Sequence, residues 1–260
     1  MTVTLTRLED VHSPELANRR DVLVALPPSY DAGRGAYPVV YMQDGQNLFD
    51  PATSFAGDWK LRNTLTEHAQ GGVEAIVIGI PNMGDERKDE YGPFPDARHG
   101  GGRGDAYIRF LVHTLKPLVD RSFRTRRDAA GTAIAGSSLG GLVSLYGFLA
   151  HPETFGAVAA LSPSIWFGRG AILRWTRGRR VAGGRVYLDV GAREPARTIR
   201  DARRMRDLLL AKGYVRGSTL AYVEDPDGGH EEAAWARRFR AVFPYLVTGA
   251  RLPAGGADAA

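Results

Sequence analysis

A serine placed between two glycines is the residue of this sequence best suited to chemistry. Ser138 is the centre of the pattern Gly-x-Ser-x-Gly at Gly136–Gly140. An apolar run at 131–135 precedes the pattern and a longer one at 141–149 follows it, which is typical of a buried strand and a buried helix. A sharp turn between such a strand and helix lifts the serine hydroxyl clear of the sheet, beside the helix N-terminus. The sequence therefore predicts that Ser138 is a nucleophile.

A serine hydroxyl is a weak nucleophile unless a base, itself oriented by an acid, removes its proton. His230 ends a polar, glycine-rich loop that follows the last predicted strand, Ser218–Val223. Glu194 follows the strand predicted before it, Arg185–Val190. The order serine, acid, histidine is that of α/β-hydrolases. We therefore predict that His230 is the base and that Glu194 is the acid.

Three aspartates remain alternatives for the acid. Asp189 lies inside a predicted strand, whose alternation can point it away from the site, and Asp201 and Asp225 are further candidates. The other histidines lie near predicted helix or loop ends, where a solvated or capping side chain is the ordinary case: His12, His68, His99, His113 and His151.

Strands and helices alternate along the chain in the way that positions such residues. The predicted strands are Thr2–Leu8, Arg20–Leu26, Tyr37–Gln43, Val73–Ile80, Gly131–Ala135, Ala157–Leu161, Arg185–Val190 and Ser218–Val223. The predicted helices are Asp58–Ala69, Asp105–Phe123, Gly141–Ala150 and Ile199–Lys212, with a helix-like run at Ala233–Phe239. The first two strands are expected to be antiparallel, and the apolar middle strands parallel and covered on both faces. This pattern predicts one α/β-hydrolase domain at 1–248, with a mostly parallel eight-stranded sheet, helices on both faces and a flexible tail at 249–260.

The loop after the predicted strand Tyr37–Gln43 is a candidate for binding the developing negative charge. In α/β-hydrolases this loop donates one backbone N–H to the oxyanion hole, and the residue after the nucleophile donates the other. The two donors would be Gln46 and Leu139. Each such donor lowers a barrier by roughly 3–4 kcal/mol. An ordinary turn at Asp44-Gly45 is the alternative.

Two further segments should border the site. Residues 81–104 form a long loop predicted to lack regular structure, with Arg87, Glu90 and Tyr91 able to rigidify it. Residues 162–184 occupy the place where these folds often insert a lid; the segment is short, so we expect a small lid or none. Trp166 in it would form a wall of an open site, with core packing as the alternative.

Composition excludes several classes of function. The chain has 260 residues and no cysteine, which excludes disulfides, thiolate metal sites and a cysteine nucleophile. The net charge of +5 comes mostly from arginines interleaved with acids, which favours a solvated helix face over a nucleic-acid site and leaves attraction of anionic substrates possible. No run reaches membrane-spanning length and the start lacks the form of a signal peptide, so we expect a cytoplasmic protein without a membrane partner.

Several motifs together resemble one family. They are Leu26–Tyr30, Tyr41–Phe49, Trp59, Gly79–Asn82 with Arg87 and Glu90-Tyr91, Gly136–Gly141, and Leu161–Ser164 with Trp166. The chain is similar to the putative esterase family, which includes siderophore (enterobactin-type) esterases, feruloyl esterases and antigen-85-like mycolyltransferases. The resemblance implies an α/β-hydrolase fold, ester hydrolysis without metal or cofactor, and a triad at Ser138, Glu194 and His230. Within the matching motifs, the residues expected to bind substrate are Asn47, Arg87, Tyr91 and Trp166.

The function predicted from the sequence is hydrolysis of a carboxylic ester through an acyl-enzyme on Ser138. An open cleft with aromatic walls favours a small-molecule substrate that is bulky, aromatic or of siderophore type. The alternatives are an acyltransferase that uses the same acyl-enzyme and a non-catalytic binding protein of this fold. The natural ester and the oligomeric state are left open.

Overall fold

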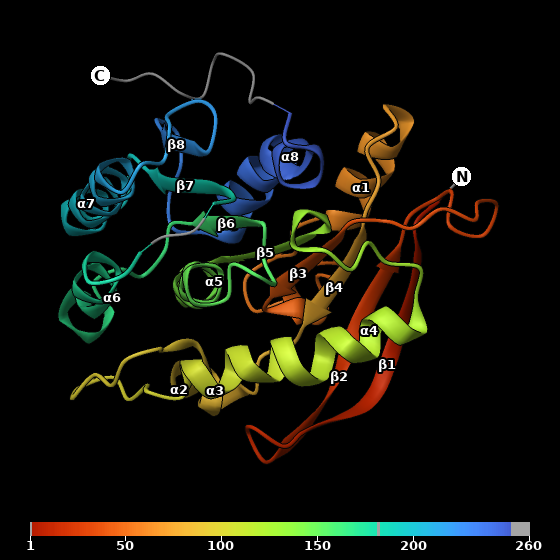
Figure 1. The fold of residues 1–260 in the computed structure, drawn as a ribbon, viewed down its shortest axis with the longest axis horizontal. Helices are drawn as coiled ribbons and strands as arrows, with labels where there is room; N and C mark the ends of the chain where they lie inside the picture. Colours follow the sequence, from red (N-terminus) through yellow and green to blue (C-terminus); the bar gives the residue numbers. More distant parts are fainter. Residues whose placement is uncertain (1, 181–182, 251–260) are drawn as a thin grey trace.

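The computed structural model describes residues 2–180 and 183–250, and the strands in them form one eight-stranded sheet (Figure 1). The order across the sheet is β1-β2-β4-β3-β5-β6-β7-β8. The strands are β1 (Thr4–Ser13), β2 (Asn18–Leu26), β3 (Val39–Gln43), β4 (Ile76–Ile80), β5 (Thr132–Ser137), β6 (Ala157–Leu161), β7 (Arg185–Gly191) and β8 (Leu220–Asp225). The β1–β2 and β2–β4 pairs are antiparallel and all the others are parallel. The predicted mostly parallel eight-stranded sheet is confirmed.

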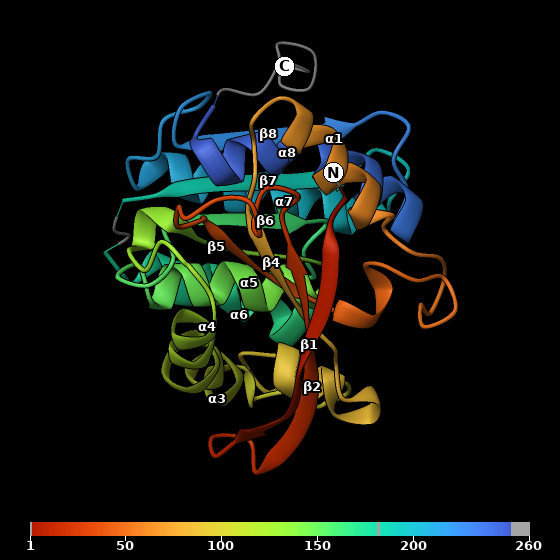
Figure 2. The ribbon, with the colours of Figure 1, turned by 90° about the vertical axis from the view of Figure 1, so that its right-hand side faces the viewer.

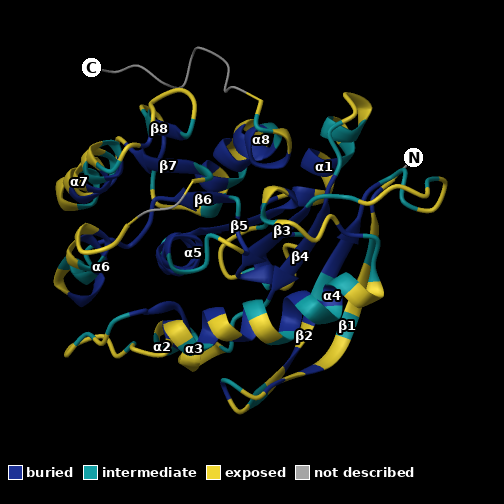
Figure 3. Ribbon diagram, viewed as in Figure 1, coloured by how far each residue is buried: buried dark blue, intermediate teal, exposed yellow. Residues whose placement is uncertain are grey.

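The parallel strands are buried on both faces, as their apolar sequences predict. Every residue of β3 is buried. Because successive side chains point to opposite faces, Val39 and Tyr41 join one apolar cluster while Val40 and Met42 join the other. Figure 3 shows the parallel strands in the buried interior, whereas much of the edge strand β1 and the outer sides of the helices are exposed.

Helices cover both faces of this sheet (Figure 2). Side chains of α1 and α8 pack in one cluster, and those of α3, α5, α6 and α7 in the other. The helices are α1 (Leu61–Gln70), α2 (Arg87–Tyr91), α3 (Gly104–Arg109), α4 (Lys116–Ser122), α5 (Leu139–Ala150), α6 (Phe167–Arg177), α7 (Ala196–Ala211) and α8 (Glu232–Thr248).

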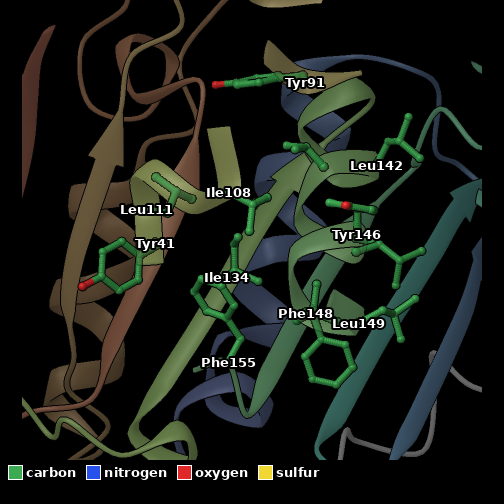
Figure 4. Packing of buried hydrophobic residues seen from close by; sticks show 14 of the residues in the cluster. Tyr41, Tyr91, Ile108, Leu111, Ile134, Leu142, Tyr146, Phe148, Leu149 and Phe155 are labelled. Atoms are coloured by element: carbon green, nitrogen blue, oxygen red, sulfur yellow. The ribbon is translucent and has the colours of Figure 1, made fainter. Parts of the chain in front are cut away.

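The central helix α5 is apolar all round because it is covered all round. All its residues from Leu139 to Leu149 are buried. Figure 4 shows Leu142 and Phe148 of α5 in one cluster with Ile108 of α3 and Ile134 of β5. This packing fixes the helix whose first turn follows Ser138.

Besides shifts at element ends, such as α8 extending to Thr248, the structure differs from the predicted elements in three places. The predicted helix Asp105–Phe123 has a π-helical segment, Phe110–Leu115, between α3 and α4. That segment ends just before Lys116-Pro117; in a regular α-helix the proline ring would meet a carbonyl one turn earlier. Strand β1 continues past Leu8 because a bulge containing Asp10, at φ 52°, restores pairing at Val11.

The third difference concerns the two segments expected at the site. The segment 81–104 is not without regular structure, because it contains a 3-10 turn at Gly84–Glu86 and the short helix α2. The segment 162–184 contains α6, which packs beside α7. The expectation of a small lid or none thus agrees with α6 lying in the helical layer (Figure 1).

The last helix, α8, ends at Thr248, and Gly249 caps it at φ 76°. Most of the predicted tail, from residue 251 on, lies outside the described residues. Among the described helices, none has both the length and the apolar character that a membrane crossing requires.

Candidate active site

Ser138 lies in a strained turn between β5 and α5. Its backbone has φ 55° and ψ −121°, and its N–H donates to the carbonyl of Leu161 at 3.0 Å. The turn requires glycine on both sides, since a Cβ at Gly136 would lie 2.7 Å from the backbone of Gly140, and one at Gly140 would lie 2.9 Å from Gln43. Strain of this kind is kept where the surrounding structure holds it. The predicted strand–turn–helix context of the serine is present.

The structure brings the predicted nucleophile, base and acid into one chain of hydrogen bonds. His230 Nε2 lies 3.0 Å from the Ser138 hydroxyl, and His230 Nδ1 lies 2.8 Å from Glu194 Oε2. The ring of Trp235 packs against the imidazole at 4.9 Å in an edge-on geometry. The three groups come from loops at the carboxyl ends of β5, β7 and β8, which are far apart in sequence. This arrangement can transfer a proton from the hydroxyl to the imidazole.

The carboxylate of Glu194 is held on its second oxygen as well. Oε1 accepts hydrogen bonds from the N–H of Gly191, at 2.9 Å, and from the hydroxyl of Ser162. Burial raises the pKa of Glu194, but hydrogen bonds from His230, Ser162 and Gly191 outweigh it and leave the pKa below its ordinary value. The carboxylate therefore stays ionised with Oε2 aimed at His230.

A buried arginine sets the direction of the Ser162 hydroxyl. Arg238 Nη2 donates to Ser162 Oγ at 3.0 Å. A guanidinium can only donate, so the Ser162 proton is left to point at Glu194. Asp189 lies 3.3 Å from Arg238 Nε and accepts the N–H of Ser162 at 2.8 Å.

The alternative acids have other partners. Asp189 is fully buried, and burial raises its pKa to about 6, even with Arg238 nearby. Asp201 pairs with Arg204, and Asp225 pairs with Arg237. The structure joins Glu194, and none of these aspartates, to His230.

The two predicted oxyanion donors lie in the first turn of α5 and in a 3-10 turn. Leu139 is the first residue of α5, where an N–H has no partner within its helix. Gln46 lies in a 3-10 turn at Gly45–Asn47. Its side-chain oxygen accepts the N–H of Asn82 at 3.2 Å, and its carbonyl accepts the hydroxyl of Thr53 at 2.7 Å. These contacts hold the loop that carries Gln46 in place.

Asp44 anchors that loop from behind. Its backbone is left-handed at φ 55°, and its N–H donates to the hydroxyl of Tyr91 at 3.1 Å. Its carboxylate accepts two hydrogen bonds from Arg87, at 2.7 and 2.8 Å, and one from Asn82 at 2.7 Å. Arg87, expected to rigidify its own loop, does pack on Tyr91, with its guanidinium 5.0 Å from the ring centre, but its ion pair is with the oxyanion loop.

Only some of the residues expected to bind substrate are open to it. Trp166 is partly exposed, whereas Tyr91 is fully buried and Asn47 is 8% exposed. The side-chain oxygen of Asn47 accepts the N–H of Phe55 at 3.2 Å. The expectation of direct substrate contact needs correction for Tyr91, because its hydroxyl is occupied by Asp44 inside the core. Arg87 keeps 26% of its side chain exposed but is directed at Asp44.

Sequence reasoning missed three residues of the site. The hydroxyl of Ser164 lies 3.2 Å from that of Ser138, and its N–H donates to the Ser138 carbonyl at 2.9 Å. Ser162 and Arg238 contact Glu194 directly or through one hydroxyl. The available signal was Ser-Pro-Ser immediately after a buried strand, since polar residues at that strand edge face the nucleophile. Arg238 gave no signal, because it looks like any arginine of an amphipathic helix.

Comparison with known proteins decides the family. The family described as "Putative esterase" matches residues 13–246. This chain belongs to that family. Membership makes it a carboxylic ester hydrolase and confirms the resemblance found in the motifs.

Two relatives and one solved structure show how far the similarity extends along the chain. It is 26% identical to the Bacillus subtilis protein YbbA, over 90% of this chain and 95% of YbbA. It is 34% identical to the siderophore triacetylfusarinine C esterase of Aspergillus fumigatus, over 54% of this chain and 49% of that protein. The crystal structure of the BES protein from Bacillus cereus superposes with a TM-score of 0.75 at 19% identity, covering 95% of the esterase and 96% of that chain. The esterase thus spans YbbA almost fully but about half of the Aspergillus protein, and its fold is that of α/β-hydrolases.

Proposed function

We propose that this esterase cleaves its substrate by two-step acyl transfer on Ser138, with His230 as the base and Glu194 as the orienting acid. The observation that carries the proposal is the pair of contacts of His230, at 3.0 Å to the Ser138 hydroxyl and at 2.8 Å to Glu194. Among the described residues, His68 and His151 also form hydrogen bonds, but with a backbone carbonyl and a carboxylate, neither of which is a hydroxyl nucleophile.

Each step follows from this geometry. Ser138 Oγ attacks the ester carbonyl while His230 Nε2 takes its proton, and the carbonyl electrons move onto the oxygen. The N–H groups of Leu139 and Gln46 bind that oxyanion. The tetrahedral intermediate collapses with loss of the alcohol, which receives the proton from His230. Water then enters, gives a proton to His230 and attacks the acyl group, and the acid is released with Ser138 regenerated.

The substrate class we propose is a bulky ester of siderophore type. Two observations support it. One is the relationship to the Aspergillus siderophore esterase. The other is that α6 packs beside α7 in the helical layer, which leaves the described part of the segment 162–184 without a large lid. The cytoplasmic location expected from the sequence is part of the same proposal, and cell fractionation checks it.

The first test is the Ser138→Ala variant. We expect kcat to fall at least about 10⁴-fold while the melting temperature changes little, because the nucleophile is lost and a small side chain remains. Labelling with a fluorophosphonate probe should disappear with activity. Ser164→Ala is the matched control, since it removes the neighbouring hydroxyl and should keep the label.

Turnover by Ser138→Ala close to that of the unchanged protein would refute the assignment. Product analysis with an added alcohol acceptor separates hydrolysis from acyl transfer. Free acid as the main product supports the esterase, and a new ester as the main product supports the transferase.

A further inference from the structure

A cationic cavity lies beside the candidate active site. It has a volume of about 220 Å³ and is lined by Asp96, Ala97, Arg98, His99, Trp166, Arg169 and Arg197. The lining thus contains three arginines and one aspartate. Neither the nucleophile nor the base lines it, and no part of the mechanism above uses it.

Two of its walls come directly from segments that contact the triad. Trp166 follows two residues after Ser164, whose hydroxyl is 3.2 Å from that of Ser138. Arg197 follows three residues after Glu194. Two residues of chain span at most about 7 Å, so the cavity is within reach of a bulky substrate bound at Ser138.

The positive charge of the cavity is largely uncompensated. Within residues 2–180 and 183–250, the guanidinium groups of Arg98 and Arg169 form no ion pair with a carboxylate. Arg197 has a long contact with Asp201, at 3.8 Å, which Asp201 shares with Arg204. Asp96 is the one carboxylate in the lining. Its oxygens accept the backbone N–H groups of Arg98, His99 and Gly168, and its single negative charge offsets only part of the positive charge of the three arginines.

The backbone that presents Arg169 is strained. Gly168, Arg169 and Gly170 are all left-handed, and the non-glycine Arg169 has φ 55°. The hydrogen bond from Gly168 N–H to Asp96, at 3.1 Å, ties this segment to the opposite wall. A left-handed conformation is costly for arginine, and such costs persist where the surrounding structure holds them, often at binding sites.

An aromatic surface lies among these charges. The Arg197 guanidinium lies 6.0 Å from the centre of the Trp166 ring, and the His99 ring meets the same indole edge-on at 5.4 Å. Guanidinium groups bind carboxylates through paired N–H donors, and an indole face binds planar rings. Together they suit a flat group that carries negative charge.

We propose that this cavity is a substrate subsite for a planar anionic group, such as an aromatic carboxylate, attached to the ester. The inference rests on the proposed function at Ser138. Such a subsite would let the esterase discriminate among bulky esters. The triad alone cannot do so, because it contacts only the ester bond.

Matched ester pairs test the subsite. Each pair differs only in ending with a benzoate or with its methyl ester, and the linker to the scissile bond is varied in length. One series carries this group on the acyl side of a 4-nitrophenyl ester, and a second carries it on the alcohol side. We expect kcat/KM to favour the anionic member about tenfold at one linker length, in one of the two series. Added salt should reduce the preference, because the arginines are exposed.

Variants identify the groups responsible. The double variant Arg169→Gln with Arg197→Gln should bring the preference close to one and leave kcat/KM for the neutral esters unchanged. Arg200→Gln is the matched control, since it removes a positive charge from α7 outside the cavity, and it should keep the preference. Melting curves verify that each variant is folded.

Three results would overturn the inference. They are equal kcat/KM for both members at every length in both series, an unchanged preference in the folded double variant, and an equal loss in Arg200→Gln. Failure of the proposed function looks different, because then no ester of either kind is turned over and Ser138 takes no phosphonate label.

Discussion

Two arginine–aspartate clusters stand behind the candidate active site, and they differ in how completely their groups are paired. The oxyanion-side cluster is Arg87 with Asp44, a two-pronged pair at 2.7 and 2.8 Å whose side chains are 26% and 9% exposed. The acid-side cluster is Arg238 with Asp189, a single contact at 3.3 Å between side chains that are 4% and 0% exposed. In the second, Arg238 Nε and Nη1 and Asp189 Oδ2 have no hydrogen-bond partner among the described residues.

The difference indicates two separate tasks. The oxyanion-side pair satisfies its own groups and so fixes a backbone shape, the left-handed turn at Asp44 that carries Gln46. The acid-side pair is poorly satisfied, which is costly in a buried place. What it supplies instead is a directed hydrogen bond: Arg238 orients the Ser162 hydroxyl, and Ser162 holds Glu194. We therefore expect substitutions in the acid-side cluster to lower the rate by disturbing the orientation of His230. Substitutions in the oxyanion-side cluster should lower it by weakening the binding of the negatively charged intermediate.

The largest effect is expected at the acid itself. Glu194→Gln should lower kcat/KM about 10³- to 10⁴-fold, because a neutral amide can hold the wrong tautomer of His230. Steady-state kinetics with a 4-nitrophenyl ester measures it. Asp189→Asn is the comparison variant, and a larger loss there than in Glu194→Gln would mean that the acid has been misassigned.

A smaller loss is expected on the oxyanion side. Arg87→Gln should lower kcat and kcat/KM together, about 10- to 100-fold, since the unpaired Asp44 carboxylate is left beside a developing negative charge. Adding Asp44→Asn should recover part of the rate, because the repulsive charge is removed. A pure rise in KM with unchanged kcat would instead assign Arg87 to substrate binding.

The positioning hydroxyl of the acid side should matter less. Ser162→Ala is expected to lower kcat about tenfold with KM unchanged, as the loss of one hydrogen bond to a charged group predicts. Ser162 has φ 43°, so Ser162→Gly removes the same hydroxyl and suits the backbone better. Equal kinetic losses in both variants point to the hydroxyl, whereas a loss confined to Ser162→Ala would point to the backbone.

The smallest effect concerns stability against acid. The pKa of Glu194 is held below its ordinary value of 4.5 in the folded protein. Such a carboxylate stabilises the fold above its unfolded pKa, and the contribution is lost as the pH falls through its folded pKa. Urea unfolding from about pH 5 to about pH 3 should therefore show a steeper loss of the free energy of unfolding in the unchanged protein than in Glu194→Gln. If the free energy of unfolding fell equally with pH in both proteins, the contacts of Glu194 would not lower its pKa in the folded state.

Local sequence patterns were sufficient to predict the turn at Ser138 and the strands around it. The turn at Ser138 is readable because a strand, two glycines and a helix are contiguous in sequence, and β6 lies at Ala157–Leu161 as predicted. The candidate acid and base could be predicted because each follows a strand end in a fixed order. The ends of the elements were harder to predict. Strand β1 continues past Leu8 because of a bulge at Asp10, and that bulge depends on pairing with β2, which is not visible in the sequence of β1.

What the sequence by itself determined is the order of chemistry-bearing residues along an alternating α/β chain, because periodicity and turn residues are local properties. Only the tertiary structure decided which polar groups meet. Arg238 lies 76 residues from Ser162, and Arg87 lies 43 residues from Asp44. Burial of Tyr91 and the cavity of three arginines likewise arise from loops brought together at one sheet edge, and no short-range pattern encodes contacts made across such distances.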